Sequence, residues 1–178
     1  MNPIIRNVLA LLTGAAIGGL VNFSIVMISG NIIPPPAGVD VTTEAGLKAG
    51  LHLFEPKHFL LPFLAHAIGT FVGALACVRI AVSMKMLLAL MIGVLFFAGG
   101  AQMVMLLPAP MWFNITDLVF AYIPMAFFAA KLGSGPEALS QENKPKKIAV
   151  FEPAKRVLVI RRFRNRRIHL SMLHSHPQ

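Results

Sequence analysis

The chain has 178 residues, of which 56% are hydrophobic and only 13% are charged, and its mean hydropathy is +0.72. A soluble domain of this length does not carry so apolar a composition, so the sequence indicates a membrane protein. The single cysteine, Cys77, lies in an apolar run and excludes a disulfide framework or a cysteine-based metal site within the chain.

The formal net charge of +9 is concentrated at one end of the chain. Residues 1–132 carry six Lys and Arg against four Asp and Glu, a net charge of +2, whereas residues 133–178 carry ten against three, a net charge of +7. The basic character therefore belongs to the C-terminal part. We expect a membrane domain over residues 1–132, followed by a linker and basic tail over residues 133–178.

The first apolar segment begins at Asn7 and continues to about Ile33, which is long enough to cross a hydrocarbon core of about 30 Å. A cleaved signal peptide has a shorter apolar region and a small-residue exit, so we interpret residues 7–33 as a retained transmembrane helix. Three consecutive prolines, Pro34 to Pro36, end this helix because they lack backbone donors and cannot continue helical geometry.

The connection over residues 34–57 contains a weak amphipathic pattern. Its apolar stripe consists of Leu47, Leu51 and Phe54, and the opposite stripe consists of Lys48, His52 and Glu55. This spacing predicts a short interfacial helix on the membrane surface, with Thr42 or Thr43 as its N-cap. Gly46 and Gly50 weaken the helical pattern.

Three more apolar segments follow, which we expect to span the membrane over residues 58–82, 86–107 and 113–132. Pro62 is expected to bend the first turns of the second span, and Pro124 lies within the fourth. Trp112 stands where amphipathic rings favour the membrane interface. The predicted fold is all-α: a polytopic membrane four-helix bundle with a short interfacial helix and a basic cytoplasmic tail.

The distribution of cations predicts the orientation of the four spans. Four cations flank one side, namely Arg6, Arg79, Lys85 and Lys131, whereas only Lys48 and Lys57 flank the other. By the positive-inside rule, both termini of this multi-pass protein are expected to be cytoplasmic, in a bacterial inner membrane. The connection over residues 34–57 is then expected to face outward.

Each span carries small residues at helical spacing, which favour close helix packing in lipid. The pairs are Gly14 and Gly18, Gly69 and Gly73, Ala89 and Gly93, and Ala126 and Ala130. Each span also carries one polar residue on the side of small residues, in the order Asn22, His66, Gln102 and Asp117. Counted from the outer ends, these four side chains are expected to form one polar layer, about 8–10 Å deep at 1.5 Å per residue.

Two interpretations of this polar layer remain open. His66 and Asp117 are the ionisable groups within the spans, and such groups mark functional sites in many membrane proteins. In a purely structural alternative, each would be satisfied by its own neighbours as a packing hydrogen bond. A contact between the imidazole and the carboxylate would favour a functional site, because a carboxylate orients and tunes a histidine.

Other sites receive less support from the sequence. His52, Glu55 and His58 are candidate lid residues, and their spacing permits a metal site, but Pro56 interrupts the helix and no HExxH or CxxC motif is present. A solvated loop face is the preferred interpretation, so no metal and no cofactor are expected. Haem bound by two histidines would need a second buried imidazole, and no motif of a serine nucleophile is found.

The tail carries a run of arginines, RRFRNRR, at residues 161–167. Its cations Arg161, Arg162, Arg164, Arg166 and Arg167 are candidates for contact with anionic lipid headgroups. A solvated tail is the alternative. Binding of nucleic acid is the least favoured because the segment is tethered to a membrane.

Four stretches resemble a family of short four-span bacterial inner-membrane proteins that has no assigned function. They are ISGNIIPPPAGVD, HLFEPKHFLLPFLAHAIGTFVGA, the glycine pair of the third span with MLLPAPMWF, and DLVFAYIPMAFFAAKL. The resemblance covers about residues 1–132 and leaves the basic tail outside it. It implies that the outer connection and the second helix are the functional region, and it supplies no catalytic or binding residues.

The sequence therefore predicts a small integral membrane protein, most simply a non-enzymatic binding, accessory or permease-like subunit. The outer connection is expected to fold over the polar layer as a lid, and association with further copies or with a membrane partner subunit is expected from the small-residue faces. The alternative is a membrane-embedded enzyme or redox accessory protein that uses His66 and Asp117.

Overall fold

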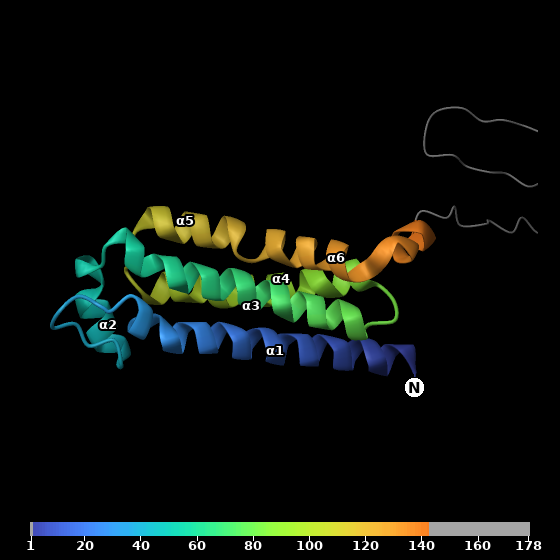
Figure 1. Cartoon of the computed structure of the whole chain (residues 1–178), viewed down its shortest axis with the longest axis horizontal. Helices are drawn as coiled ribbons and strands as arrows, with labels where there is room; N and C mark the ends of the chain where they lie inside the picture. The colour runs from blue at the N-terminus through green and yellow to red at the C-terminus, as the bar shows by residue number, and fades with distance from the viewer. Residues whose placement is uncertain (1, 143–178) are drawn as a thin grey trace, which may run out of the picture. The chain divides into compact units, whose positions relative to one another are not determined.

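A computed structural model describes residues 2–142, and the surroundings of side chains as far as residue 134 (Figure 1). The chain divides into two compact units, Met1–Gly135 and Pro136–Gln178, and the packing described below belongs to the first. Within residues 2–142 the structure contains helices and no strand. In chain order these are α1 (Pro3–Ile32), α2 (Glu44–Gly50), the short 3-10 helices η1 (Leu51–Leu53) and η2 (Pro56–Phe59), α3 (Leu60–Ile80), α4 (Lys85–Leu106), α5 (Met111–Phe120) and α6 (Ile123–Glu142).

Four helical segments are long and apolar enough to cross a membrane, namely Pro3–Ile32, Pro56–Ile80, Lys85–Leu106 and Met111–Ser134. Large apolar side chains such as Leu12, Leu20 and Phe128 are exposed along them. The prediction of an all-helical chain with four such helices is confirmed, and the predicted ends differ from the observed ends by a few residues, the usual uncertainty of helix termini.

The closest helix packing is between α1 and α3, which lie side by side in Figure 1. A Cβ atom placed on Gly14 would lie 2.6 Å from the carbonyl oxygen of Gly73, and one on Gly18 would lie 2.6 Å from that of Gly69. Both distances are too short for a real side chain. The four glycines therefore let the two backbones touch directly, as the small-residue spacing predicted.

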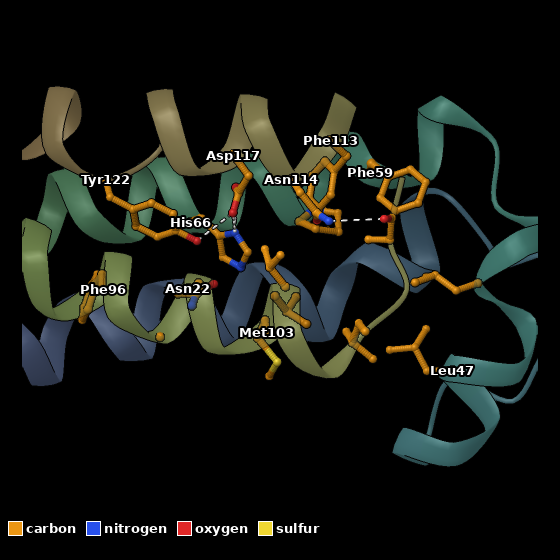
Figure 2. Close-up of a pocket in the computed structure, with 18 of the residues that line it drawn as sticks. Asn22, Leu47, Phe59, His66, Phe96, Met103, Phe113, Asn114, Asp117 and Tyr122 are labelled. Atoms are coloured by element: carbon orange, nitrogen blue, oxygen red, sulfur yellow. Dashed lines mark hydrogen bonds and ion pairs between the residues drawn. The ribbon is translucent and has the colours of Figure 1, made fainter. Parts of the chain in front are cut away.

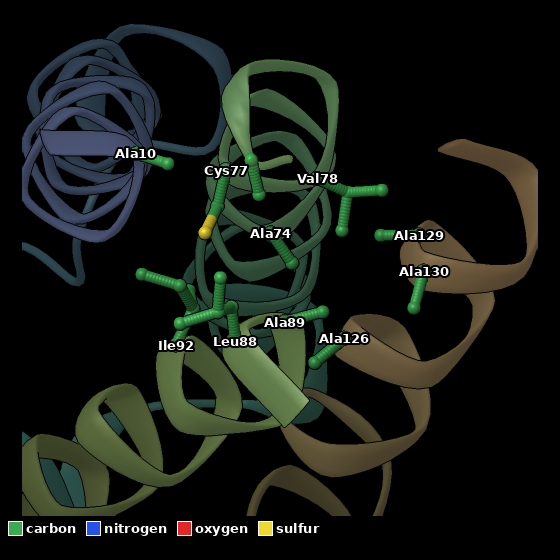
Figure 3. Packing of buried hydrophobic residues seen from close by; sticks show 11 residues of the cluster. Ala10, Ala74, Cys77, Val78, Leu88, Ala89, Ile92, Ala126, Ala129 and Ala130 are labelled. Carbon is green, nitrogen blue, oxygen red and sulfur yellow. The ribbon is translucent and has the colours of Figure 1, made fainter. Parts of the chain in front are cut away.

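At the N-terminal end of α1 the core is built mainly of small side chains (Figure 3). It contains Ala10, Ala74, Cys77, Val78, Ala81, Leu88, Ala89, Ile92, Ala126, Ala129 and Ala130, all buried. A Cβ on Gly93 of α4 would lie 2.8 Å from the Cβ of Ala126 in α6. The predicted small-residue pairs of α4 and α6 thus also lie at helix contacts.

Polar contacts join α1 to the turn between α3 and α4. The Arg6 side chain donates its Nε–H to the carbonyl of Ile80 at 2.9 Å, and Asn7 donates to the hydroxyl of Ser83 at 2.9 Å. Met84 ends this turn with φ of 52°, a left-handed conformation that is strained for a residue with a side chain. The cations Arg6, Arg79 and Lys85 therefore lie at one end of the first unit, and α2 lies at the other (Figure 1).

The fourth apolar segment, for which the sequence predicted a span over residues 113–132 with Pro124 inside it, is divided into α5 and α6. Pro124 explains the break, because it has no N–H to donate to the carbonyl of Phe120 and its ring crowds that carbonyl. Two turn residues, Ala121 and Tyr122, separate the helices, and both are buried. The break places a tyrosine in the interior at a point where a regular helix would continue.

The other end of α6 also differs from the prediction. Residues 133–142 were expected to form a linker because of their glycine, serine and proline content, but α6 continues to Glu142. Glu137, Ala138 and Leu139 favour helix, but Gly133, Gly135 and Pro136 do not, so local propensity alone does not explain this continuation. The remainder of the predicted linker and tail lies outside the described residues.

The connection before α3 contains the predicted short helix. The Thr43 side chain caps α2 by accepting a hydrogen bond from the N–H of Gly46 at 3.1 Å, which confirms that this threonine is the cap. The two glycines that weakened the prediction are required by packing. A Cβ on Gly46 would lie 2.5 Å from the carbonyl oxygen of Asp40, and one on Gly50 would overlap the side chain of Val39.

Candidate functional site

His66, Asp117 and Tyr122 form one hydrogen-bonded group in the interior (Figure 2). The His66 Nδ1 atom lies 2.8 and 2.9 Å from the two carboxylate oxygens of Asp117, and the Tyr122 hydroxyl donates to Asp117 Oδ2 at 2.7 Å. The side chains of His66 and Asp117 are only 21% and 5% exposed. Residues 51 positions apart in the sequence thus share one buried polar contact.

The direction of these hydrogen bonds follows from the acceptor. A carboxylate only accepts hydrogen bonds, so Nδ1 of His66 carries the proton and donates it, in parallel with the tyrosine hydroxyl. The Thr70 hydroxyl is used elsewhere, because it donates to the backbone carbonyl of His66 at 2.7 Å. In the neutral imidazole, Nε2 therefore remains as an acceptor.

The break between α5 and α6 positions the tyrosine. Its ring stacks on the imidazole of His66, with centroids 5.7 Å apart and an angle of 29° between the planes. On the other side, Gly100 of α4 leaves the space that the Tyr122 phenol occupies, since a Cβ there would overlap the hydroxyl and the ring. Phe97 meets the same ring edge-on at 6.1 Å. The hydroxyl is thus held against Asp117 by packing on several sides.

This polar group lies in the wall of a cavity of about 550 Å³. The cavity is bounded by α1, α3, α4 and α5 and by side chains of the connection before α3. Most of its wall is apolar, and the aromatic side chains include Phe54, Phe59, Phe96 and Phe113. A cavity of this volume, mainly apolar and with a few convergent polar groups, is typical of small-molecule sites.

Three of the four residues of the predicted polar layer line this cavity: Asn22, His66 and Asp117. The fourth, Gln102, is exposed and does not line it, so its placement in the layer was wrong. Of the adjacent glycines of α4, Gly99 lies three residues before Gln102 and is exposed, whereas Gly100 is buried. Gln102 is two residues from Gly100, about 200° around the helix, and therefore points away.

The asparagine of the layer has an unusual environment. Among the described residues, Asn22 Oδ1 is the one buried side-chain polar atom without a hydrogen-bond partner. A buried acceptor that is left unsatisfied costs about 1–3 kcal/mol, so this oxygen is an unfavourable feature of the packing beside the cavity.

The three predicted lid residues have different environments. His58 lines the cavity, and its Nδ1 accepts a hydrogen bond from the N–H of Glu55 at 2.9 Å. His52 and Glu55 are exposed and do not line it. Glu55 pairs with Lys57 at 2.9 Å, and this hydrogen bond lowers the pKa of the carboxyl below its ordinary value. The exposed stripe of the connection is therefore solvated rather than part of the site.

The apolar stripe of the same connection is the part that reaches the site. Leu47, Leu51 and Phe54 all line the cavity, and Figure 2 shows Leu47 beside it. Phe59 continues this apolar contact, with its ring 4.8 Å from that of Phe113 in α5. The connection thus lies against the end of the cavity through its apolar residues.

Sequence reasoning missed two site residues. Tyr122 is the only tyrosine of the chain, and it is brought to Asp117 by the helix break at Pro124. Asn114 lies three residues before Asp117, on the same face of α5, and donates to the carbonyl of Ala109 at 3.2 Å. The helical spacing was sufficient to find Asn114, whereas the position of Tyr122 depends on the break.

The remaining candidates do not add to this site. Within residues 2–142, no three His, Cys, Asp or Glu side chains are placed so that they could hold a metal ion. The candidate lipid-contact arginines, Arg161, Arg162, Arg164, Arg166 and Arg167, lie outside the described residues. Comparisons with protein-family models, with curated proteins and with solved structures find no match for the chain.

Proposed function

We propose that this chain is an integral protein of a bacterial inner membrane that binds a small amphipathic molecule in the cavity beside His66 and Asp117. Its four apolar helices would form a membrane-spanning bundle, with the small-residue contacts in its interior and the exposed leucines and phenylalanines in lipid. The family of inner-membrane proteins that the sequence resembles is consistent with this location.

In the proposed orientation, both termini lie in the cytoplasm. Arg6, Arg79 and Lys85 lie at one end of the first unit and Lys48 and Lys57 flank the other, as the positive-inside rule requires. The cavity then lies toward the outer face. Helix α2 would rest at the outer interface, with Leu47 turned toward the cavity as part of a lid.

The observation that carries the proposal is the buried carboxylate–imidazole contact in the wall of a cavity. A charged group within a membrane-spanning helix is expensive to bury, and a protein that needed only packing would place apolar residues there. Here the group borders a volume large enough for a ligand, and the polar side chain of Asn22 lines the same volume. Binding, with or without transport, is therefore favoured over a purely structural role.

The proposal is tested by filling the cavity without touching its polar groups. Gly99 lines the cavity, and a Cβ there would meet no atom within 4 Å, so Gly99→Leu should extend into the open volume. Gly19→Leu is the matched control, because Gly19 is equally open but does not line the cavity. Both variants would be purified in phosphatidylcholine nanodiscs.

The probes are three naphthalenes of one size: 1-naphthylmethylamine, 1-naphthylmethanol and 1-naphthoate. Binding would be measured by fluorescence titration against empty nanodiscs. We expect at least one probe to bind saturably to the wild type and to Gly19→Leu, and to lose this binding in Gly99→Leu. The proposal is wrong if no probe binds saturably, or if Gly99→Leu binds as well as its control.

A second candidate function, a membrane-embedded enzyme or redox accessory protein, is favoured by one specific feature. Asp117 fixes the His66 tautomer and leaves Nε2 as an acceptor, which is the arrangement of a general base. No serine, threonine or cysteine lines the cavity, so such a base would act on water or on the ligand itself. Lipid and metabolite profiles of cells that express wild type or His66→Gln would decide: a product that requires His66 supports catalysis, and identical profiles contradict it.

Two further proposals rest on the sequence. The arginines of residues 161–167 would hold the tail on anionic headgroups. Co-sedimentation with mixed vesicles would test this by comparing the full chain with a chain that ends at residue 142. Association of copies is also proposed. The predicted small-residue pairs are already used inside the chain, so an oligomer would need other surfaces, and a monomeric particle in mild detergent would contradict it.

A further inference from the structure

The polar atoms at the inner part of the cavity are mainly hydrogen-bond acceptors. In the neutral form of His66, Nε2 accepts, because Nδ1 holds the proton that goes to Asp117. Asn22 also lines the cavity, although its Oδ1 is itself buried. Asn114 uses its Nδ2 to donate to the carbonyl of Ala109, which leaves its own carbonyl oxygen. A donor on a ligand would therefore find acceptors in the Asp117 carboxylate and in Nε2 of the neutral His66.

Among its lining residues, the cavity wall carries one carboxylate, that of Asp117, and neither lysine nor arginine. The two lysines at this end, Lys48 and Lys57, are paired at 2.9 Å with Glu44 and Glu55 outside the cavity. An anion placed there would face a carboxylate in a medium of low dielectric constant, with no fixed cation to offset the repulsion.

Aromatic rings surround the rest of the volume. Phe54 and Phe59 border the end toward the connection, Phe113 borders the α5 side and Phe96 the α4 side. Such rings bury an apolar body well, and their faces attract a cation through the ring quadrupole. The walls therefore suit a molecule that is apolar over most of its surface and positively charged at one point.

From these three features we propose that the ligand is an amphipathic organic cation, namely a protonated amine whose N–H groups point to Asp117 and His66. Its apolar body would lie between the phenylalanines, and His58 would stand at the outer end. This inference rests on the proposed function, since it names the chemical class of molecule that the same cavity takes. The carboxylate of Asp117 would then make a charge-assisted hydrogen bond, the strongest type available in the cavity.

The naphthalene series tests the charge of the ligand separately from the existence of a site. The amine is cationic at neutral pH, the alcohol is neutral and the naphthoate is anionic, whereas the ring is the same. In phosphatidylcholine nanodiscs we expect the wild type to bind the amine with a dissociation constant at least about tenfold lower than that of either other probe. N-dimethylation of the amine should weaken binding, because it removes two of the three donors.

Asp117→Asn then removes the charge while keeping the size of the side chain. We expect this variant to bind the amine about tenfold more weakly than the wild type does, and to bind the alcohol within about threefold of the wild-type value. The comparison of the three probes on the wild-type protein needs no variant, so it decides the matter even if Asp117→Asn does not fold.

The outcomes separate the two proposals. Preference for the amine, lost in Asp117→Asn, supports the organic cation. Saturable, cavity-dependent binding of the alcohol or the naphthoate that equals or exceeds binding of the amine overturns the cation and leaves the proposed function standing. Absence of saturable binding by all three probes overturns both.

Discussion

The contact between α1 and α3 gives the sharpest prediction of stability. Gly73 of α3 is buried, and a Cβ added to it would lie 2.7 Å from the carbonyl oxygen of Gly14 and 3.0 Å from the Cα of Gly18. The nearer distance is 0.7 Å short of the 3.4 Å at which ordinary van der Waals contact begins. Both opposing atoms belong to the backbone, so Gly73→Ala can be accommodated only if the two helices move apart.

The expected cost follows from two opposing effects. Overpacking of a well-packed interior costs about 1–3 kcal/mol. Alanine also has a higher helix propensity than glycine, by about 1 kcal/mol in soluble helices. We therefore expect Gly73→Ala to destabilise the protein by up to about 2 kcal/mol. Gly19→Ala in α1 should be neutral or stabilising, because a Cβ added to Gly19 would meet no atom within 4 Å.

The assay is equilibrium unfolding in mixed micelles of a mild detergent with increasing dodecyl sulfate, followed by circular dichroism. The quantity to compare is the difference in unfolding free energy between Gly73→Ala and Gly19→Ala. Equal stabilities of the two variants would refute the reasoning, because they would show that the glycines of α1 and α3 do not need to touch.

Three further predictions concern single side chains. Tyr122→Phe removes the donor to Asp117 Oδ2 and should lower the unfolding free energy by about 1–3 kcal/mol in the same assay; an unchanged value would contradict the buried hydrogen bond. Met84→Gly removes a left-handed non-glycine residue and should raise the unfolding free energy by up to about 1 kcal/mol, whereas a decrease would show that φ of 52° is not strained. Hydrogen bonds from Thr42 and Thr43 lower the pKa of Asp40, so the stability that they give the connection is present above the ordinary pKa of 3.8 and is lost as the pH falls through the lowered pKa. Amide exchange of residues 40–46 should therefore accelerate only in that acidic range. Acceleration near neutral pH would contradict this prediction.

Much of the fold follows from local features of the sequence. Apolar length sufficed to predict four helices that are long and apolar enough to span a membrane. The spacing of Gly14 and Gly18 and of Gly69 and Gly73 sufficed to predict which faces of two of them are closely packed. These predictions succeed because a helix in lipid needs only length and apolar composition, and because small residues permit close approach wherever they align.

The parts that failed depend on contacts between helices. Two adjacent glycines, Gly99 and Gly100, lie on different faces of α4, and only packing against Tyr122 shows which one is buried. The placement of Gln102 was therefore wrong. Pro124 was visible in the sequence, but a proline can bend a helix or divide it, and here the division carries Tyr122 to Asp117. The site was thus predicted in its ionisable pair and missed in the group that completes it.

The most direct test of the central claim is solid-state NMR of the His66 side chain in bilayers, with nitrogen-15 in the ring and carbon-13 in the aspartate carboxyl groups. The structure predicts that Nδ1 carries a proton and that this proton correlates with the carboxyl carbon of Asp117. Asp117→Asn should change the Nδ1 shift without unfolding the helices. A proton on Nε2, with no correlation to Asp117, would contradict the buried polar site and the functions proposed from it.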